Sequence, residues 1–221
     1  MTISFEEAFL GVEKEIVIHR YEECSTCHGS GAKPGTNPIT CKVCNGTGQI
    51  RQMQNTILGQ MQTTRTCPEC HGTGQVIEEP CVECRGKGKV RKQAKISLKI
   101  PAGINDDQTV VLRGEGGPGE KGGPKGDVYV NVHIKRHALY KREGNNVICE
   151  IPITITQATL GADLNIPMVD GTNEKVSIPE GTQTGTKFRV RNKGFKVING
   201  TSQGDFIFNV TVQTPKKLSK E

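Results

Sequence analysis

A cysteine motif that recurs four times constrains this chain more than any other feature of its sequence. Each copy reads Cys-x-x-Cys-x-Gly-x-Gly, and the paired cysteines are Cys24, Cys27, Cys41, Cys44, Cys67, Cys70, Cys81 and Cys84. A Cys-x-x-Cys turn, or knuckle, places two sulfur atoms side by side, and two knuckles supply the four tetrahedral thiolates that zinc prefers. The glycines allow the positive φ angles of the sharp turn beside the sulfurs. The repeat therefore predicts two structural Zn²⁺ sites per chain.

Iron–sulfur ligation and a disulfide framework are the alternative uses of such cysteines. Residues 1–7 lack the basic start and the apolar run of a signal peptide. No apolar stretch approaches the ~20 residues of a membrane span. We therefore expect a cytoplasmic protein without a membrane partner, in which thiols stay reduced and bind metal. His28 and His71 follow knuckles and are expected to be surface turn residues, and the ninth cysteine, Cys149, a small buried hydrophobe.

Four knuckles can be paired in three ways. Residues 49–66 can run out and back as a hairpin between the second and third knuckles. The first knuckle follows a strand that ends near His19, and the fourth precedes a strand that begins near Gln93. If these strands are neighbours in one sheet, the pairing is nested, and pairing of adjacent knuckles is the alternative. The nested sites are Cys24, Cys27, Cys81 and Cys84 for the first, and Cys41, Cys44, Cys67 and Cys70 for the second.

A second, longer repeat organises the rest of the chain. Residues 100–132 align without gaps on residues 178–210, and short matches relate residues 3–11 to 153–161. The cysteine motifs fall in an insertion within the first copy. Aliphatic residues alternate with polar ones in several short runs, which is typical of half-buried strands, and only residues 5–10 and 156–160 suggest helix.

The two repeats together predict a mainly β protein. It has two similar β-sandwich-like domains, and an elongated zinc-binding hairpin module is inserted in the first. The expected boundaries are 1–23 plus 90–142 for the first β-domain, 24–89 for the zinc module, 143–214 for the second β-domain, and 215–221 for a truncated tail.

The charge of the chain bears on two other functions. The formal charge of +6 falls to +2 when eight thiolates hold two Zn²⁺ ions, and the zinc module contains no aromatic residue. A zinc-dependent nucleic-acid-binding module is therefore disfavoured, because it requires clustered basic and aromatic residues. A Cys-x-x-Cys thiol–disulfide oxidoreductase is the other alternative, but thiolates that bind zinc are already engaged. We find no convincing catalytic set and expect no enzyme.

The cysteine array inserted in a duplicated β-domain resembles the type I J-domain co-chaperones, the DnaJ family. Further matching segments are Ile3-Ser-Phe-Glu-Glu-Ala8, Ile100-Pro-Ala-Gly103, Gly126-Asp-Val128 and the residues around Leu160-Gly161. That family begins with a J domain carrying a His-Pro-Asp motif and ends with a dimerisation segment. This sequence has no His-Pro-Asp and stops at Glu221. We therefore expect a middle fragment, monomeric by itself, of a dimeric full-length protein.

The resemblance implies a stress-response chaperone. Its partners would be unfolded or partly folded polypeptides, which it keeps from aggregating, and DnaK, which receives them. The resemblance also implies that the distal zinc site either contacts DnaK or contributes thiol chemistry during this transfer. In the family, a groove on the first β-domain binds extended apolar segments partly by strand addition. Carried over to this sequence, the groove comprises Ile16, Ile18, Ile96, Leu98 and Val130. The alternative is that these alternating aliphatic residues belong to the core.

Overall fold

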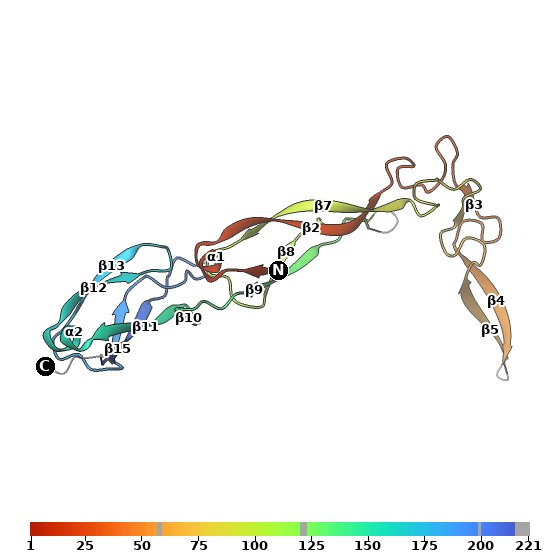
Figure 1. Ribbon diagram of the computed structural model, residues 1–221. Helices are drawn as coiled ribbons and strands as arrows, with labels where there is room; N and C mark the ends of the chain where they lie inside the picture. The colour runs from red at the N-terminus through yellow and green to blue at the C-terminus, as the bar shows by residue number, and fades with distance from the viewer. Residues whose placement is uncertain (57–58, 120–122, 199, 215–221) are drawn as a thin grey trace. The chain divides into compact units, whose positions relative to one another are not determined.

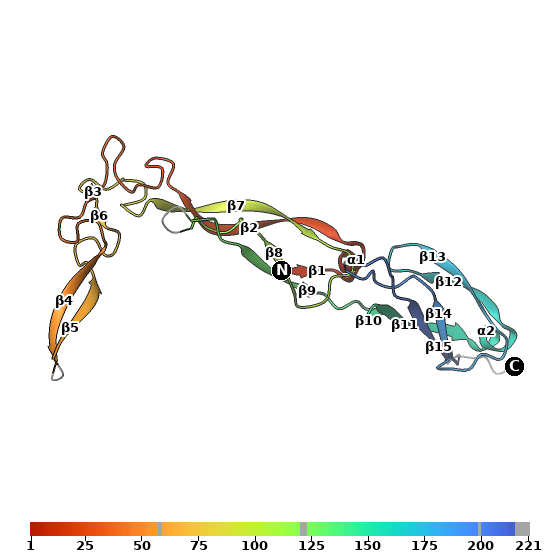
Figure 2. The same cartoon turned by 180° about the vertical axis from the view of Figure 1, so that it is seen from behind.

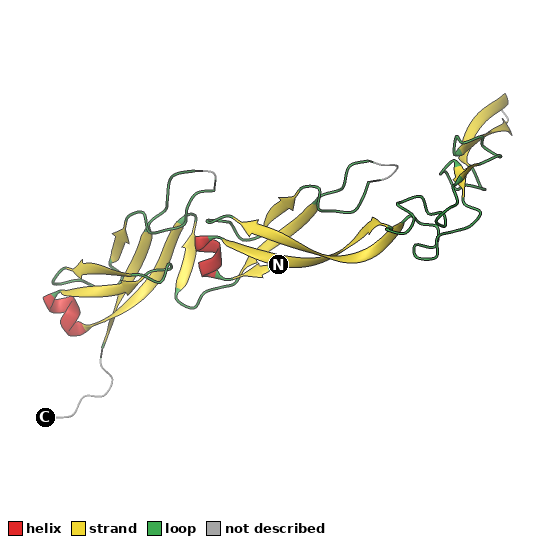
Figure 3. Cartoon of the chain, turned by 90° about the horizontal axis from the view of Figure 1, so that it is seen from above, coloured by secondary structure: helices red, strands yellow, loops and turns green. Residues whose placement is uncertain are grey.

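The computed structural model describes residues 1–56, 59–119, 123–198 and 200–214, so the predicted tail at 215–221 lies outside the described residues. The described chain consists mainly of strands with two short helices, which confirms the predicted fold class (Figures 1 and 3). The elements are β1 (Thr2–Ile3), α1 (Phe5–Leu10), β2 (Val12–Glu23), β3 (Ile39–Thr40), β4 (Gln49–Thr56), β5 (Gly59–Thr66), β6 (Gln75–Val76), β7 (Lys89–Ile100), β8 (Gln108–Leu112), β9 (Val128–Ile134), β10 (Tyr140–Glu143), β11 (Asn146–Thr154), α2 (Ile155–Leu160), β12 (Ala162–Pro167), β13 (Asn173–Ile178), β14 (Lys187–Val190) and β15 (Phe206–Gln213).

The chain divides into two compact units. The first contains residues 1–16, 96–112 and the chain from 128 onward, and the second contains residues 17–95 and 113–127. Both sequence copies of the β-domain contribute to the first unit, and all paired cysteines lie in the second. The division into three domains at the boundaries given above stays a prediction.

Strand pairing in the first unit reproduces the internal repeat residue by residue. In the first copy, β1 runs parallel to β9 with Ile3 opposite Ile134. In the second copy, β11 runs parallel to β15 with Ile153 opposite Val212. The antiparallel register of β8 with β9 recurs between β14 and β15, and the paired residues correspond through the alignment of residues 100–132 on residues 178–210. The sheets of this unit are therefore β1-β9-β8 and the larger β10-β11-β15-β14, with β12-β13 as a separate pair.

Both helices of the first unit begin and end in the same way. Ser4 and Glu7 form a capping box at α1, and Thr154 and Gln157 form the equivalent one at α2, so each helix start is hydrogen-bonded by its own side chains. Each helix then stops at a glycine with positive φ, which is +80° at Gly11. These local signals explain why six-residue helices form within a β fold.

The two units differ in what they bury. The first unit has one continuous apolar cluster to which both copies contribute side chains, and Phe195, Phe206 and Phe208 are fully buried in it. In the second unit, each described cluster of buried residues consists of four cysteines, with Val90 against one, and Ile50 and Val76 against the other. So small an apolar core offsets little of the entropy of ordering the module. Metal coordination, which the sequence predicts, would supply the missing stabilisation.

Three two-stranded pairings carry the cysteine knuckles. β2 pairs with β7, β3 with β6, and β4 with β5. The β4–β5 hairpin is antiparallel, with Gln49 opposite Thr66, and is seen in the two opposite views of Figures 1 and 2. Both features on which the nested pairing depends are therefore present: the first and last knuckles adjoin neighbouring strands, and a hairpin joins the middle two.

Candidate metal centres

The first four-thiol group joins the first and fourth knuckles. Its members, Cys24, Cys27, Cys81 and Cys84, are all buried, and their sulfur atoms lie within 4.8 Å of one another. The Sγ atoms of Cys24 and Cys81 are 3.9 Å apart, and those of Cys27 and Cys84 are 3.6 Å apart.

The second group joins the middle two knuckles at the base of the β4–β5 hairpin. Cys41, Cys44, Cys67 and Cys70 are equally buried and equally close. The Sγ atoms of Cys41 and Cys67 are 3.8 Å apart, and those of Cys44 and Cys70 are 3.6 Å apart. The structure thus brings together the same two sets of four cysteines that the nested pairing expects.

These sulfur separations fit a tetrahedral metal ion. Four Zn–S bonds of about 2.3 Å place the sulfurs about 3.8 Å apart, whereas a disulfide requires about 2.05 Å. The observed separations of 3.6 to 3.9 Å match the first value, and all nine cysteines are free thiols. The donor set therefore fits Zn²⁺, and the identity of the metal stays a prediction.

Backbone N–H groups are directed at one sulfur of every knuckle. The last glycine of each repeat donates to the second cysteine, as from Gly31 to Cys27 at 3.3 Å, and the other three distances are 3.2 to 3.3 Å. Such donors stabilise the thiolate form that binds metal. The residue after each second cysteine also has a positive φ, including the exposed His28 and His71, which are turn residues as expected.

The last glycine of each repeat also packs closely across the metal centre, which sequence analysis missed. A Cβ atom on Gly31 would lie 2.5 Å from the carbonyl oxygen of Gly86 in the partner knuckle. Equivalent contacts below 3.0 Å occur for Gly48, Gly74 and Gly88, each against a glycine of its partner knuckle. The requirement for glycine therefore comes from close approach as well as from φ. The constant position of this glycine in all four repeats signals that glycine is required there. Only the pairing of the knuckles in the structure reveals the carbonyl oxygen that it packs against.

The metal-free thiols differ in acidity. Burial raises the pKa of Cys24 to about 11. At Cys27 burial acts in the same direction, but the N–H of Gly31 and the adjoining thiols outweigh it and lower the pKa to about 7. In the second group the same balance lowers the pKa of Cys70 to about 6. Each group thus holds a sulfur that is readily deprotonated near neutral pH, as metal binding requires.

The expected groove residues differ in exposure. Ile16 on β2 is half-buried and packs against the core of the first unit. Leu98 is fully buried and Val130 is 9% exposed, both within that core. Ile96 is also buried, at 6% exposed. Ile18 is half-buried, on the part of β2 that belongs to the second unit. Their binding role stays a prediction.

Duplicated β copies with two four-thiolate groups inserted in the first define a class of β-domain proteins with a cysteine-rich module. Within that class, the chain belongs to the family described as the DnaJ C terminal domain, which it matches over residues 1–215. Within the described residues, no helix combines the length and the apolar character needed to cross a membrane.

Three relatives, each described as "Chaperone protein DnaJ", are about half identical to this chain. The protein of Ruminiclostridium cellulolyticum is 55% identical over 217 residues, covering 98% of this chain and 57% of the relative. That of Acetivibrio thermocellus is 51% identical, covering 100% of this chain and 57% of the relative. That of Bacillus cytotoxicus is 49% identical, covering 99% of this chain and 60% of the relative. The chain thus spans less than two thirds of each relative. These are names of chaperones rather than enzymes, which agrees with the expectation that the chain is not an enzyme.

Proposed function

We propose that this chain is the part of a cytoplasmic co-chaperone that binds exposed hydrophobic segments of unfolded polypeptides. It prevents their aggregation and hands them to DnaK. The observation that supports this most strongly is the family match over residues 1–215, with relatives described as chaperone proteins. The two Zn²⁺ ions proposed for the four-thiol groups have a structural role, because four protein ligands leave no open coordination position.

The proposed client groove lies along β2. Ile16 and Ile18 are two residues apart and so face the same side of the strand. Both are half-buried and keep apolar surface available to a client. Ile96, Leu98 and Val130 are buried, and in this proposal they form the floor of the groove rather than its contact surface. A client segment adds as a strand and inserts an apolar side chain above this floor.

Light scattering of a chemically denatured client, diluted into buffer with an excess of the zinc-loaded chain, tests this function. The unmodified chain is expected to suppress the scattering. The double variant Ile16→Ser and Ile18→Ser is expected to lose suppression, because burying two aliphatic side chains against a client contributes about 1.5–3 kcal/mol for each one fully buried.

A matched control lies on the opposite face of the same strand. Val17 and Tyr21 are each 56% exposed, and the double variant Val17→Ser and Tyr21→Ser removes apolar surface without touching the proposed groove. This control is expected to suppress scattering like the unmodified chain. Loss of suppression in the control alone would contradict the groove assignment. No suppression by the unmodified, zinc-loaded chain would contradict the proposed function itself.

A further inference from the structure

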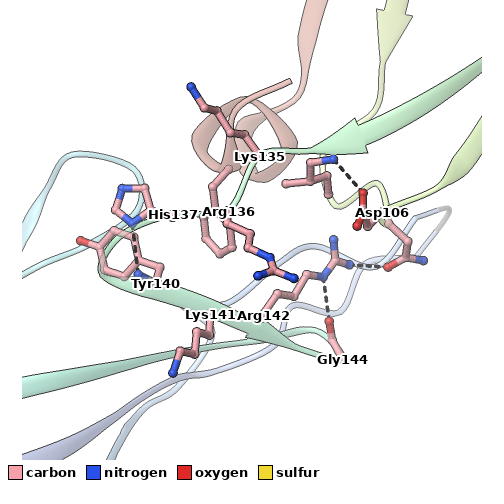
Figure 4. A pocket seen from close by; sticks show the side chains of 11 residues that line it. Asp106, Lys135, Arg136, His137, Tyr140, Lys141, Arg142 and Gly144 are labelled. Carbon is pink, nitrogen blue, oxygen red and sulfur yellow. Dashed lines mark hydrogen bonds between the residues drawn. The ribbon is translucent and has the colours of Figure 1, made fainter. Parts of the chain in front are cut away.

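A hollow of about 620 Å³ lies in the first unit, near the segment that joins β9 to β10. Its lining includes four side-chain cations, namely Lys135, Arg136, Lys141 and Arg142, against the single carboxylate of Asp106 (Figure 4). That carboxylate already accepts a hydrogen bond from the backbone N–H of Ile134 at 2.7 Å. The hollow therefore has a strong excess of positive charge, and none of the proposed groove residues lines it.

Arg142 is the most confined of these cations. Its guanidinium group donates to the carbonyl oxygens of Gly103 (3.0 Å), Gly144 (2.8 Å) and Ile104, and to Oδ1 of Asn105 at 2.7 Å. Every one of these acceptors is uncharged. Burial lowers the pKa of Arg142, as expected for a cation withdrawn from water without an anion beside it.

Arg20 shows how a confined arginine is otherwise accommodated in this chain. Its guanidinium group forms ion pairs with Glu22 at 3.0 Å and Glu115 at 2.9 Å. Arg142 has no such partner in the part of the chain that the structure describes. Arg136 lines the same hollow as Arg142 (Figure 4), and among the described residues it also forms no ion pair with a carboxylate. An anion in the hollow would be attracted by both guanidinium groups.

The strand beside the hollow is suited to an extended peptide. Lys141 and Arg142 belong to β10, which among the described residues pairs with β11 alone and lies at the edge of its sheet. At the first residue of this strand the backbone N–H of Tyr140 already donates to Nδ1 of His137 at 3.1 Å, so the edge is open beyond Tyr140. A free strand edge offers backbone hydrogen bonds to a peptide, while the side chains set its charge preference. The aromatic rings in the lining are not free to stack on a nucleic-acid base, because Tyr140 and His137 stack on each other at 4.6 Å and Tyr140 is 8% exposed.

We propose that this hollow binds an acidic peptide segment, whose carboxylates lie between Arg136 and Arg142 and whose backbone runs along the edge of β10 at Lys141 and Arg142. This site is separate from the proposed client groove. It takes charged rather than apolar segments, so the two sites would select different parts of a partner polypeptide.

The probe is a fluorescein-labelled peptide with four consecutive glutamates, titrated with the zinc-loaded chain and followed by fluorescence anisotropy. The same peptide with four glutamines is expected not to bind. Binding of the glutamate peptide is expected to weaken as salt is raised, because the contacts are partly exposed charge pairs. Failure of the unmodified chain to bind the glutamate peptide, or equal binding of both peptides, would overturn the proposal.

Two exposed cations of the hollow make the test variant, which avoids the structural contacts of Arg142. The double variant Arg136→Gln and Lys141→Gln is expected to weaken binding at least about fivefold, from two lost charge pairs. The matched control Lys187→Gln and Arg191→Gln removes the same charge from exposed positions elsewhere in the unit and is expected to change binding less than about twofold. Equal weakening of peptide binding in the test and control variants would show that the peptide responds only to the net charge of the chain, and would overturn the proposed site. Stronger binding of an oligothymidylate, lost in the same test variant, would assign the hollow to nucleic acid instead.

Discussion

Replacing Gly74 by alanine separates the two reasons for a glycine at the end of each knuckle. Gly74 has φ +77°, and a Cβ atom there would lie closer than 3.0 Å to the carbonyl oxygen of Gly46 across the second metal centre. Gly35 provides the matched control within the same unit. Its φ is +90°, but a Cβ atom there would meet nothing within 4 Å. Gly35→Ala therefore introduces the backbone strain without the contact.

The expected effects differ in kind. Left-handed φ costs a residue with a Cβ atom about 1–2 kcal/mol, and both variants incur this strain. The contact in Gly74→Ala is with a backbone carbonyl, so no side-chain rotation relieves it and the two knuckles have to move apart by several tenths of an ångström. Metal–ligand distances tolerate about 0.2 Å. We therefore expect at least a tenfold loss of zinc affinity at the second site, or about 1.4 kcal/mol.

Competition with a chromogenic zinc chelator measures this affinity, and the metal content of the dialysed protein gives the stoichiometry. The unmodified chain and Gly35→Ala are expected to hold two tightly bound zinc ions, and Gly74→Ala one tight and one weakened. The first centre supplies an internal reference, because the second group shares none of its ligands with it. Equal affinities in Gly74→Ala and Gly35→Ala would refute the close-approach argument.

Two further predictions concern the cysteines. The double variant Cys24→Ser and Cys27→Ser is expected to release one zinc and to make Cys81 and Cys84 reactive to alkylation, read by peptide mass spectrometry; reactivity of the second knuckle instead would support adjacent pairing. Burial raises the pKa of Cys149 to about 12, so the folded state keeps a proton that the unfolded state loses above its own pKa of about 8.5. Stability is therefore expected to fall by up to about 1.4 kcal/mol per pH unit between about pH 9 and 12. Chemical denaturation of Cys149→Ala should show a shallower fall, and an unchanged slope would contradict this assignment.

Local features of the fold were predictable because they depend on neighbouring residues. Residues 5–10 suggest a short helix, which the structure shows at the same bounds, and alternation predicts the strands of the duplicated copies. Each knuckle likewise contains its own turn. The registers of the two copies agree at the sequence offset, since the repeat places the same residue types at the same spacing.

The depth of the groove residues was not predictable in this way. Alternation identifies which residues share a face of β2 and β7, but it does not tell how much of that face other strands cover. Leu98 is fully buried while Ile16 is half-buried, because burial depends on the neighbours that the fold brings to each side chain. The same limit applied to Arg142, whose partners include a turn about forty residues earlier in the chain.

The sequence by itself determined that four knuckles exist and that they are inserted in the first of two β-domain copies, because these features depend on spacing and residue type. It also predicted that the eight paired thiols bind metal. Only the tertiary structure decided which knuckles face each other and which cations converge on one hollow. The β2–β7 pairing brings Cys24 beside Cys81, which are far apart in sequence. Contacts of this kind depend on strand pairing between distant segments, and no local pattern encodes that choice.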